Sequence, residues 1–272
     1  MAARLRALPA ISLSAVLPLL HGRSSFPTTA GKSLSFRRFS SRPVARSSPL
    51  VEVSAQARRG FSFQEDDFAS TADLCFESPL KIVEYPDPIL RATNKRINTF
   101  DENLKKLVEE MFDLMYKTDG IGLSAPQVGI SVQLMVFNPA GERGEGEQIV
   151  LVNPVVYKTS KRTILYNEGC LSFPEIYADV ERPASVKVGA RDITGGRFKV
   201  NLSGLPARVF QHEFDHLQGT LFFDRMTEDV LESIRSDLKA LEMKYESRTG
   251  LPSPESIDQY ERRKEVAGFA RT

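Results

Sequence analysis

The sequence predicts an α+β fold in which antiparallel β-sheets surround a central helix that carries a His-Glu-x-x-His motif. One helix is expected N-terminal to this arrangement and one C-terminal to it. Three observations predict it: residues 101–120 have the apolar spacing of a helix, residues 132–203 contain short β-branched runs, and residues 204–219 place the motif between helix start and stop signals. A run of strands followed by helices is typical of the α+β class.

The first predicted helix spans residues 101–120. Asp101 precedes it and can cap its first turn, and Gly120 ends it. Its apolar residues recur at three- and four-residue spacing: Leu104, Leu107, Val108, Met111, Leu114 and Met115. One face of this helix is therefore expected to pack against the core.

The predicted strands are short, rich in β-branched residues and bounded by Pro, Asn or Gly. They are VQLMVFNP at 132–139, EQIVLVNPVVY at 147–157 and RTILYNEG at 162–169. The segment 184–204 alternates apolar and polar residues around Gly195-Gly196, which predicts a β-hairpin. These signals favour antiparallel pairing.

Two helical patterns follow the strands. Ser203 or Gly204 is the expected start of the motif helix, and Gly219 is its expected stop. A second amphipathic pattern over roughly 227–246 predicts the C-terminal helix. The residues after Gly250 contain prolines and a charged run, which predicts a loosely packed extension.

The charge of the chain is unevenly distributed. Residues 1–60 contain nine Arg and one Lys against a single acid, Glu52, although the whole 272-residue chain carries a formal charge of +1. The remainder is therefore acidic, with a net charge of about −8. This balance argues against nucleic acid as the main ligand, because phosphate neutralisation requires Lys and Arg.

The basic N-terminal segment is rich in Ser and nearly free of acids, which predicts an organelle transit peptide over residues 1–60 rather than a secretory signal. A plastid is favoured over a mitochondrion. The apolar run in the leader is too short to span a bilayer, so no membrane partner is expected. The predicted organisation continues with a linker at 61–79, a folded unit at 80–248 and an extension at 249–272.

The His-Glu-x-x-His motif suggests a metal site. His212 and His216 are four residues apart on a helix and can share one face, although a solvated pair is the plainer alternative. The third histidine, His21, lies in the leader, which excludes a third histidine ligand. Phe222 occupies the position at which metzincins have their last histidine, so that class is excluded too.

Two kinds of third ligand remain open. A downstream helical glutamate is one, and Glu228, Glu232 and Glu242 are available. Cys170 is the better candidate, on a predicted turn between apolar strands, forty-two residues before His212. Two imidazoles and one thiolate leave the fourth position of a tetrahedral site for water, which is the catalytic arrangement.

Three blocks of the sequence resemble the three signature motifs of the peptide deformylases: GIGLSAPQVG at 120–129, EGCLSFPE at 168–175 and QHEFDHLQG at 211–219. The resemblance covers roughly residues 80 to 245, and three blocks in this order form a highly specific signal. With its leader, the chain is similar to the plant organellar deformylases of the B type. The resemblance makes 80–248 the expected catalytic domain.

The resemblance implies the roles of several residues. Cys170, His212 and His216 are expected to hold the metal ion, and Glu213 to move the protons. The oxyanion is expected to accept hydrogen bonds from the side-chain amide of Gln127 and from the backbone N–H of Leu171. The implied substrate-binding residues are Ile121, Gly122, Gly169, Leu205 and Val209. Core packing is the alternative role of Ile121, Leu205 and Val209.

Two positions depart from the family pattern. Ser124 stands where Ala is usual in the first motif, a small residue in place of a small residue. Tyr177 stands where many bacterial relatives have an Arg that contacts the substrate backbone. The second departure bears on how this chain holds substrate residues beyond the first.

The resemblance also implies the cofactor and the partners. One divalent ion is expected: Fe²⁺ is favoured, and Zn²⁺ or Ni²⁺ are possible, since thiolate and imidazole ligands suit them alike. The implied substrates are N-formylmethionyl nascent peptides near the organelle ribosome, in the plastid stroma with the mitochondrion as an alternative. The oligomeric state is left open. The alternatives to a deformylase are a metalloendopeptidase with a Glu third ligand and a non-catalytic metal-binding protein.

Overall fold

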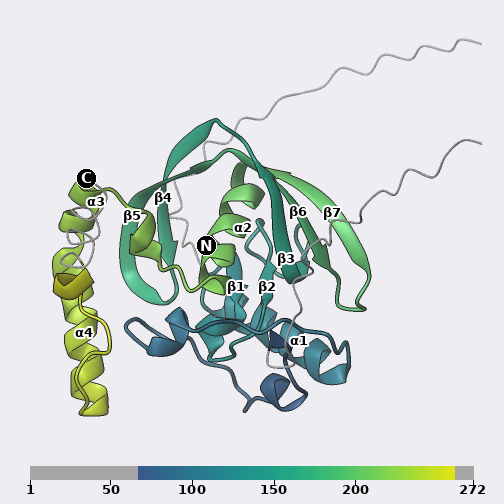
Figure 1. The fold of residues 1–272 in the computed structure, drawn as a ribbon, viewed down its shortest axis with the longest axis horizontal. Helices are drawn as coiled ribbons and strands as arrows, with labels where there is room; N and C mark the ends of the chain where they lie inside the picture. The colour runs from purple at the N-terminus through teal and green to yellow at the C-terminus, as the bar shows by residue number, and fades with distance from the viewer. Residues whose placement is uncertain (1–66, 261–272) are drawn as a thin grey trace, which may run out of the picture. The chain divides into compact units, whose positions relative to one another are not determined.

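A computed structural model describes residues 67–260 (Figure 1). The transit peptide expected over 1–60, the start of the expected linker and the end of the expected extension lie outside these residues. The strands are β1 Gly122–Ser124, β2 Leu134–Phe137, β3 Ile149–Thr159, β4 Thr163–Cys170, β5 Phe173–Pro183, β6 Ser185–Arg191 and β7 Arg197–Ser203. The α-helices are α1 Glu102–Lys117, α2 Gly204–Leu217, α3 Glu228–Ser233 and α4 Arg235–Thr249. The 3-10 helices are η2 Ala72–Leu74, η3 Pro88–Arg91, η4 Ala125–Val128 and η5 Phe222–Arg225.

The strands form two antiparallel sheets, so the prediction of a mixed helix and antiparallel-sheet fold is confirmed. The larger sheet has the order β1-β2-β3-β6-β7, and β4 pairs with β5 in a separate two-stranded sheet. The expected hairpin around Gly195-Gly196 is β6–β7, with Arg191 opposite Arg197 at its closed end. Figure 1 shows α2 lying between the two sheets.

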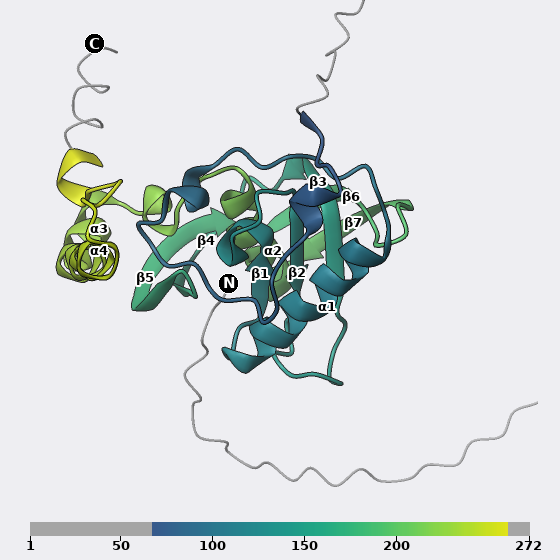
Figure 2. The same ribbon diagram turned by 90° about the horizontal axis from the view of Figure 1, so that it is seen from below.

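The two faces of the larger sheet are covered by different helices. Strand residues alternate between the faces, so Leu134 and Val136 of β2 pack with α1 while Met135 and Phe137 pack with α2. Figure 2 shows α1 lying along β1 and β2, where its contacts with the sheet are made. At the β6–β7 end of that face, the ring of Phe100, just before α1, lies against Arg191.

Both predicted ends of the first two helices are close to those in the structure. The carboxylate of Asp101 accepts hydrogen bonds from the backbone N–H groups of Asn103 and Leu104, at 3.0 and 3.1 Å, and caps α1. Ser203 precedes α2 in an extended conformation, and Gly219 follows it with a positive φ of 66°. A Cβ at Gly219 would lie 2.9 Å from the backbone oxygen of Arg91, so glycine is required there.

The C-terminal region differs from its prediction in two ways. The helix expected over roughly 227–246 is broken at Ile234, whose φ and ψ of −110° and 5° separate α3 from α4. Ile234 is buried in the same apolar cluster as Leu231 and Leu238, so the break keeps an apolar anchor between the two helices. The segment after Gly250 is not loose up to Tyr260, because the side chain of Ile257 is fully buried in the cluster that includes Leu238.

Ionic contacts fasten this C-terminal segment. The guanidinium of Arg91 hydrogen-bonds to Glu255, with Nη2 2.6 Å from Oε1, and it also pairs with Asp224. These three residues are called the terminal network below. At the other end, Ala69 and Leu74 of the expected linker are buried in the cluster that contains α1. In the part of the chain that the structure describes, no helix combines the length and the apolar character needed to cross a membrane.

Candidate metal centre

Three potential metal ligands meet between the two sheets. Cys170 ends β4, and His212 and His216 lie one turn apart on α2. Their donor atoms all lie within 4.8 Å of one another, and Sγ of Cys170 is 3.3 Å from Nε2 of His216. All three side chains are buried. Among the described residues, no other group of three such donors comes this close together.

The donor set fits a divalent cation. One thiolate and two imidazoles are three of the four ligands of a tetrahedral catalytic site. Nε2 of His212 is buried and has no hydrogen-bond partner among the described residues, whereas its Nδ1 is hydrogen-bonded. A buried nitrogen without a partner is costly unless it binds something else, and a metal ion supplies that partner.

Burial sets the protonation of the three ligands. It raises the pKa of the Cys170 thiol to about 12, with a further contribution from the negative charge of Glu213. Burial also lowers the pKa of His212 and, more strongly, that of His216, which keeps both imidazoles neutral. Neutral imidazole is the metal-binding form, and a coordinated thiol loses its proton to the metal charge.

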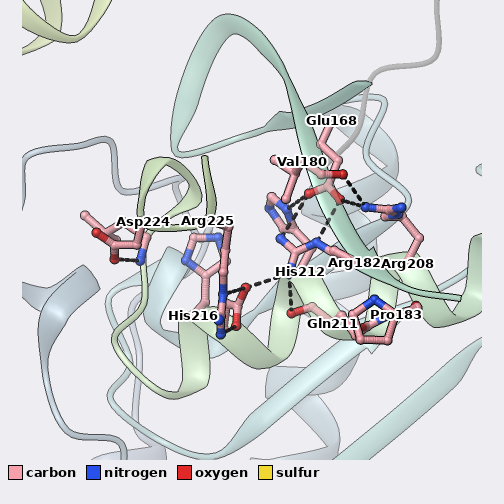
Figure 3. Close-up of polar contacts among 12 residues, drawn as sticks. Glu168, Val180, Arg182, Pro183, Arg208, Gln211, His212, His216, Asp224 and Arg225 are labelled. Atoms are coloured by element: carbon pink, nitrogen blue, oxygen red, sulfur yellow. Dashed lines mark hydrogen bonds and ion pairs between the residues drawn. The ribbon is translucent and has the colours of Figure 1, made fainter. Parts of the chain in front are cut away.

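Glu168 holds His212 in position. Its Oε2 lies 3.0 Å from Nδ1 of His212 (Figure 3), which leaves Nε2 as the ring nitrogen available to a metal ion. Burial raises the pKa of the Glu168 carboxyl, but the hydrogen bond to His212 and the charge of Arg182 outweigh burial and hold that pKa well below its usual range. The residue is therefore a carboxylate hydrogen-bonded to a potential metal ligand, the arrangement that orients ligands in metal sites.

Two arginines neutralise Glu168. Arg182 donates through Nε at 2.8 Å and through Nη2 at 3.0 Å, and Arg208 donates through Nη1 at 2.8 Å. Arg182 also reaches Asp215 of α2, with Nη1 2.6 Å from Oδ2. Their side chains are at most 8% exposed. Glu168, Arg182, Arg208 and Asp215 are called the buried network below.

Glu213 follows His212 directly and is fully buried beside β1. A Cβ built on Gly122 would lie 2.7 Å from Oε1 of Glu213 and 2.7 Å from Cγ1 of Val209. Gly122 has no positive φ, so the absence of a side chain, rather than backbone conformation, is what this position provides. It leaves room for the carboxylate next to the three ligands.

The side chain of Gln127 is oriented toward the three potential ligands by hydrogen bonds at the start of η4. Its Oε1 accepts hydrogen bonds from the backbone N–H and the hydroxyl of Ser124, at 2.9 and 2.8 Å. The amide nitrogen is therefore turned toward β4, where it lies 3.6 Å from Sγ of Cys170 and 3.4 Å from Oγ of Ser172. Ser124, a departure from the family pattern, thus supplies the hydroxyl that fixes this amide.

The other expected site residues surround the centre. Leu171 forms the tight turn between β4 and β5, directly after Cys170. Gly169 pairs with Tyr177 across these strands, and a Cβ on Gly169 would lie 2.7 Å from the tyrosine ring. Tyr177 therefore lies against the strand edge next to the centre, and its side chain is partly exposed.

The three expected pocket residues are placed differently from one another. Ile121 and Val209 are nearly fully buried in one apolar cluster with β2, β3 and β6. Leu205 lies in the first turn of α2 and packs only partly against that cluster. Core packing thus accounts for the burial of Ile121 and Val209, and their contact with a substrate stays a prediction.

The sequence analysis did not identify the residues that hold the potential ligands in position. Glu168 lies inside the second motif block, two residues before Cys170, so its position was a usable signal. Arg182 and Arg208 are distant in sequence and gave none. Asn94 was also missed: its side-chain amide donates to the backbone oxygens of His216 and Leu217, at 3.3 and 3.1 Å, and so caps the end of α2.

The glutamates considered as alternative ligands lie elsewhere. None of Glu228, Glu232 and Glu242 belongs to the group of potential metal ligands. Glu242 accepts hydrogen bonds from the hydroxyl of Tyr85 and the backbone N–H of Ile257, both at 2.8 Å. Glu232 is ion-paired on the surface. Cys170 is the third donor that the fold brings to the two histidines.

Comparison with known proteins assigns the chain to a family. The family model described as Polypeptide deformylase matches residues 79–231. The chloroplastic peptide deformylase 1B of Oryza sativa subsp. japonica is 66% identical over 238 residues, covering 84% of this chain and 88% of that protein. The chloroplastic/mitochondrial peptide deformylase 1B of Arabidopsis thaliana is 65% identical and covers 84% of each chain.

Solved structures agree. A crystal structure of a point mutant of Arabidopsis thaliana peptide deformylase 1B is 70% identical, with a TM-score of 0.65 over 66% of this chain and 98% of its own. The chain belongs to the polypeptide deformylase family, whose members are metal-dependent enzymes. This assignment confirms the deformylase prediction over an endopeptidase and over a non-catalytic metal protein.

Proposed function

We propose that this chain hydrolyses the N-formyl group from formylmethionine at the start of nascent organelle-encoded polypeptides and releases formate. One observation carries the proposal. Cys170, His212 and His216 form a three-donor centre, and the two groups needed for hydrolysis, Glu213 and Gln127, are buried beside it. A structural metal site closes its fourth position and needs neither of those groups.

Cys170, His212 and His216 hold one divalent ion, with Fe²⁺ favoured and Zn²⁺ or Ni²⁺ as other occupants. A mixed thiolate and imidazole donor set supports all of these metals. When bound, such an ion lowers the pKa of a water molecule to about 7 and polarises a carbonyl oxygen. The buried network keeps His212 oriented toward the ion through Glu168.

Glu213 is the general base and then the general acid. It takes the proton of the attacking water and delivers it to the amine that leaves, a role typically worth about 10²–10⁴-fold in rate. Gln127 and the backbone N–H of Leu171 donate hydrogen bonds to the oxyanion. One such donor in a dry site typically supplies about 2.7–4 kcal/mol. The orientation of the Gln127 amide by Ser124 supports its assignment.

The substrate lies along two glycine-containing strands. The backbones at Gly122 and Gly169 allow its close approach, and Ile121, Leu205 and Val209 form the apolar pocket for the methionine side chain. At the position where many bacterial relatives have an arginine, this chain has Tyr177, whose ring lies on the β5 edge next to Gly169. Backbone contacts beyond the first substrate residue are therefore weaker than they are with an arginine.

The site of action is the plastid stroma, beside the organelle ribosome, with the mitochondrion as an alternative. Residues 1–60 act as the transit peptide, 61–79 as a linker, 80–248 as the catalytic domain and 249–272 as an extension. The basic, Ser-rich leader supports this organisation. Relatives named chloroplastic, one of them also mitochondrial, support the location.

Formate release tests the proposal. Protein lacking the leader is purified without oxygen and given a formyl-Met peptide, an acetyl-Met peptide and a peptide cleavable only at internal bonds. Formate from the first substrate alone, decaying on slow exposure to air, is the expected result and indicates ferrous iron. Cleavage of the internal-bond peptide, or no formate from a protein that holds one metal ion per chain, would contradict it.

A further inference from the structure

The outer face of β3, β6 and β7 has an unusual charge composition. These three strands contain five cationic residues and no Asp or Glu, although the chain beyond the leader is acidic overall. The cations are Lys158, Lys187, Arg191, Arg197 and Lys199. These five residues are called the basic face. Among the described residues, no carboxylate lies within ion-pair distance of any of them.

The register of the strands places these charges against one another. Arg191 is directly opposite Arg197 on β6 and β7, and Lys158 is directly opposite Lys187 on β3 and β6. Like charges at opposed positions destabilise a sheet. Two such pairs without a neutralising carboxylate are therefore a cost to the fold, and a bound polyanion would remove that cost.

The basic face is turned away from the metal centre. Val186, Val188 and Ala190 of β6 pack toward α2, so the alternate residues Lys187 and Arg191 point to the opposite side of the sheet. On that side α1 packs mainly against β1 and β2, and the ring of Phe100, just before α1, lies against Arg191 at the closed end of the β6–β7 hairpin. A ligand on the basic face leaves the approach to Cys170 and α2 free.

An aromatic ring lies among the cations. Tyr157 is 61% exposed, and a Cβ on Gly189 would lie 2.5 Å from its ring, so the ring rests directly on the glycine. The ammonium of Lys199 is 5.1 Å from the ring centroid. A groove of about 610 Å³ runs past Tyr157, Arg191, Arg197 and Lys199. A partly hollowed sheet face with cations and an exposed ring is the combination that binds single-stranded nucleic acid.

We propose that the basic face binds single-stranded RNA, with its five cations on the phosphates and Tyr157 stacked against a base. A bilayer or an acidic peptide would use the cations but has no bases to stack on the ring. The choice of RNA over DNA rests on the proposed function, since nascent chains emerge beside ribosomal RNA. The acidity of the chain beyond the leader argues against nucleic acid as its main ligand, and a local basic face is compatible with that.

The test measures binding of a labelled 20-nucleotide single-stranded RNA by fluorescence anisotropy at several salt concentrations. The protein begins at residue 61, because the basic leader would bind RNA by itself. The solved relative matches 66% of this chain over 98% of its own length, so a shorter chain of this family folds. The face variant carries Arg191→Glu, Arg197→Glu and Lys199→Glu, and the matched control carries Lys105→Glu, Lys106→Glu and Lys117→Glu on α1.

Wild type is expected to bind with a log–log salt slope of about −3.5, because each of the five phosphates neutralised on a single strand contributes about 0.7. The face variant is expected to lose at least tenfold in affinity and about two units of slope, while the control, with the same net charge, keeps both. Tyr157→Ala is expected to lose about tenfold, the typical worth of one stacked base. Formate release by both triple variants is expected to equal that of wild type, which also shows that they fold.

Three results would overturn the proposal. The first is an equal loss of RNA affinity in the face variant and in the α1 control. The second is that poly-glutamate binds as tightly as RNA while Tyr157→Ala leaves RNA affinity unchanged. The third is the absence of RNA binding at low salt. The second result would indicate an acidic protein partner. A single-stranded DNA of the same sequence tests the choice of RNA. Because no formylated substrate is used in the binding measurement, this proposal and the proposed function can fail separately.

Discussion

Two arginine–carboxylate networks in this molecule use the same chemistry in different surroundings. In the buried network, the side chains of Glu168 and Arg182 are 0% and 5% exposed, and one carboxylate oxygen contacts His212, a potential metal ligand. In the terminal network, the side chains of Arg91 and Glu255 are 30% and 20% exposed, and they fasten the C-terminal segment. The first network sits behind the candidate metal centre, and the second holds a peripheral segment in place.

The difference teaches that contact geometry alone does not set the importance of an ion pair. Removing one partner of a buried pair leaves a charge that water cannot reach, which typically costs about 3–5 kcal/mol. An exposed pair is typically worth about 0.2–1 kcal/mol, because water and salt screen it. Mutations of matched chemistry in the two networks should therefore have very different effects, and only those in the buried network should reach the metal.

The largest effect is expected for Glu168→Gln. The change keeps the shape of the side chain but removes the charge that neutralises Arg208 and orients His212. We expect the free energy of unfolding of the metal-free protein to fall by about 3–5 kcal/mol, and metal affinity to fall about 10- to 100-fold. Urea denaturation and chelator competition measure these two quantities. Metal affinity equal to that of wild type would show that Glu168 does not position His212.

Gly122→Ala comes next, because it disturbs Glu213 without touching either network. The added methyl group would lie 2.7 Å from the Glu213 carboxylate and from Val209, so the carboxylate must move. A displacement of about 1 Å from productive geometry can cost about 10²-fold in rate. We expect kcat for formate release to fall by about that factor while one metal ion per chain is retained. An unchanged kcat would place Glu213 outside the reaction.

Glu255→Gln makes in the terminal network the same chemical change as Glu168→Gln. Arg91 keeps Asp224 as a partner, and the site is partly hydrated. We expect a loss of about 0.2–1 kcal/mol in the free energy of unfolding, with metal affinity and kcat unchanged. If this variant were destabilised as much as Glu168→Gln, burial would not be what separates the two networks.

The smallest effect is expected for Arg143→Ala. Its ion pair with Asp113 joins side chains that are 57% and 66% exposed. We expect the free energy of unfolding to change by no more than about 0.5 kcal/mol, as for most surface substitutions. A larger loss in urea denaturation would mean that surface pairs contribute more to this fold than their hydration allows.

Local sequence signals predicted much of the fold. The cap at Asp101, the hairpin around Gly195-Gly196 and the glycine after α2 each depend on a few adjacent residues. The break at Ile234 did not have such a signal, because it depends on burial against a distant cluster. The burial of Ile257 was missed for the same reason: nothing near it in sequence indicates that Arg91 and Glu242 hold its segment.

In the candidate site, too, the residues with a local sequence signal were predictable, and those that depend on long-range packing were not. His212 and His216 are visible in the sequence because helical spacing places them on one face, and the motif blocks add Cys170 and Gln127. Arg182 and Arg208 were not predictable, because they reach Glu168 only after β4, β5 and α2 come together. The orientation of Gln127 by Ser124 was equally hidden, since it needs the backbone geometry of η4. Long-range packing therefore supplies the residues that support the potential ligands, and short motifs supply the potential ligands themselves.

The most direct test of the central claim combines metal content and formate release in two variants purified without oxygen. Glu213→Gln is expected to keep one metal ion per chain and to release formate from a formyl-Met peptide at least 10²-fold more slowly than wild type. Cys170→Ala is expected to lose both metal and activity. Full turnover in Glu213→Gln, or stoichiometric metal in Cys170→Ala, would contradict the account of a deformylase centre built on Cys170, His212 and His216.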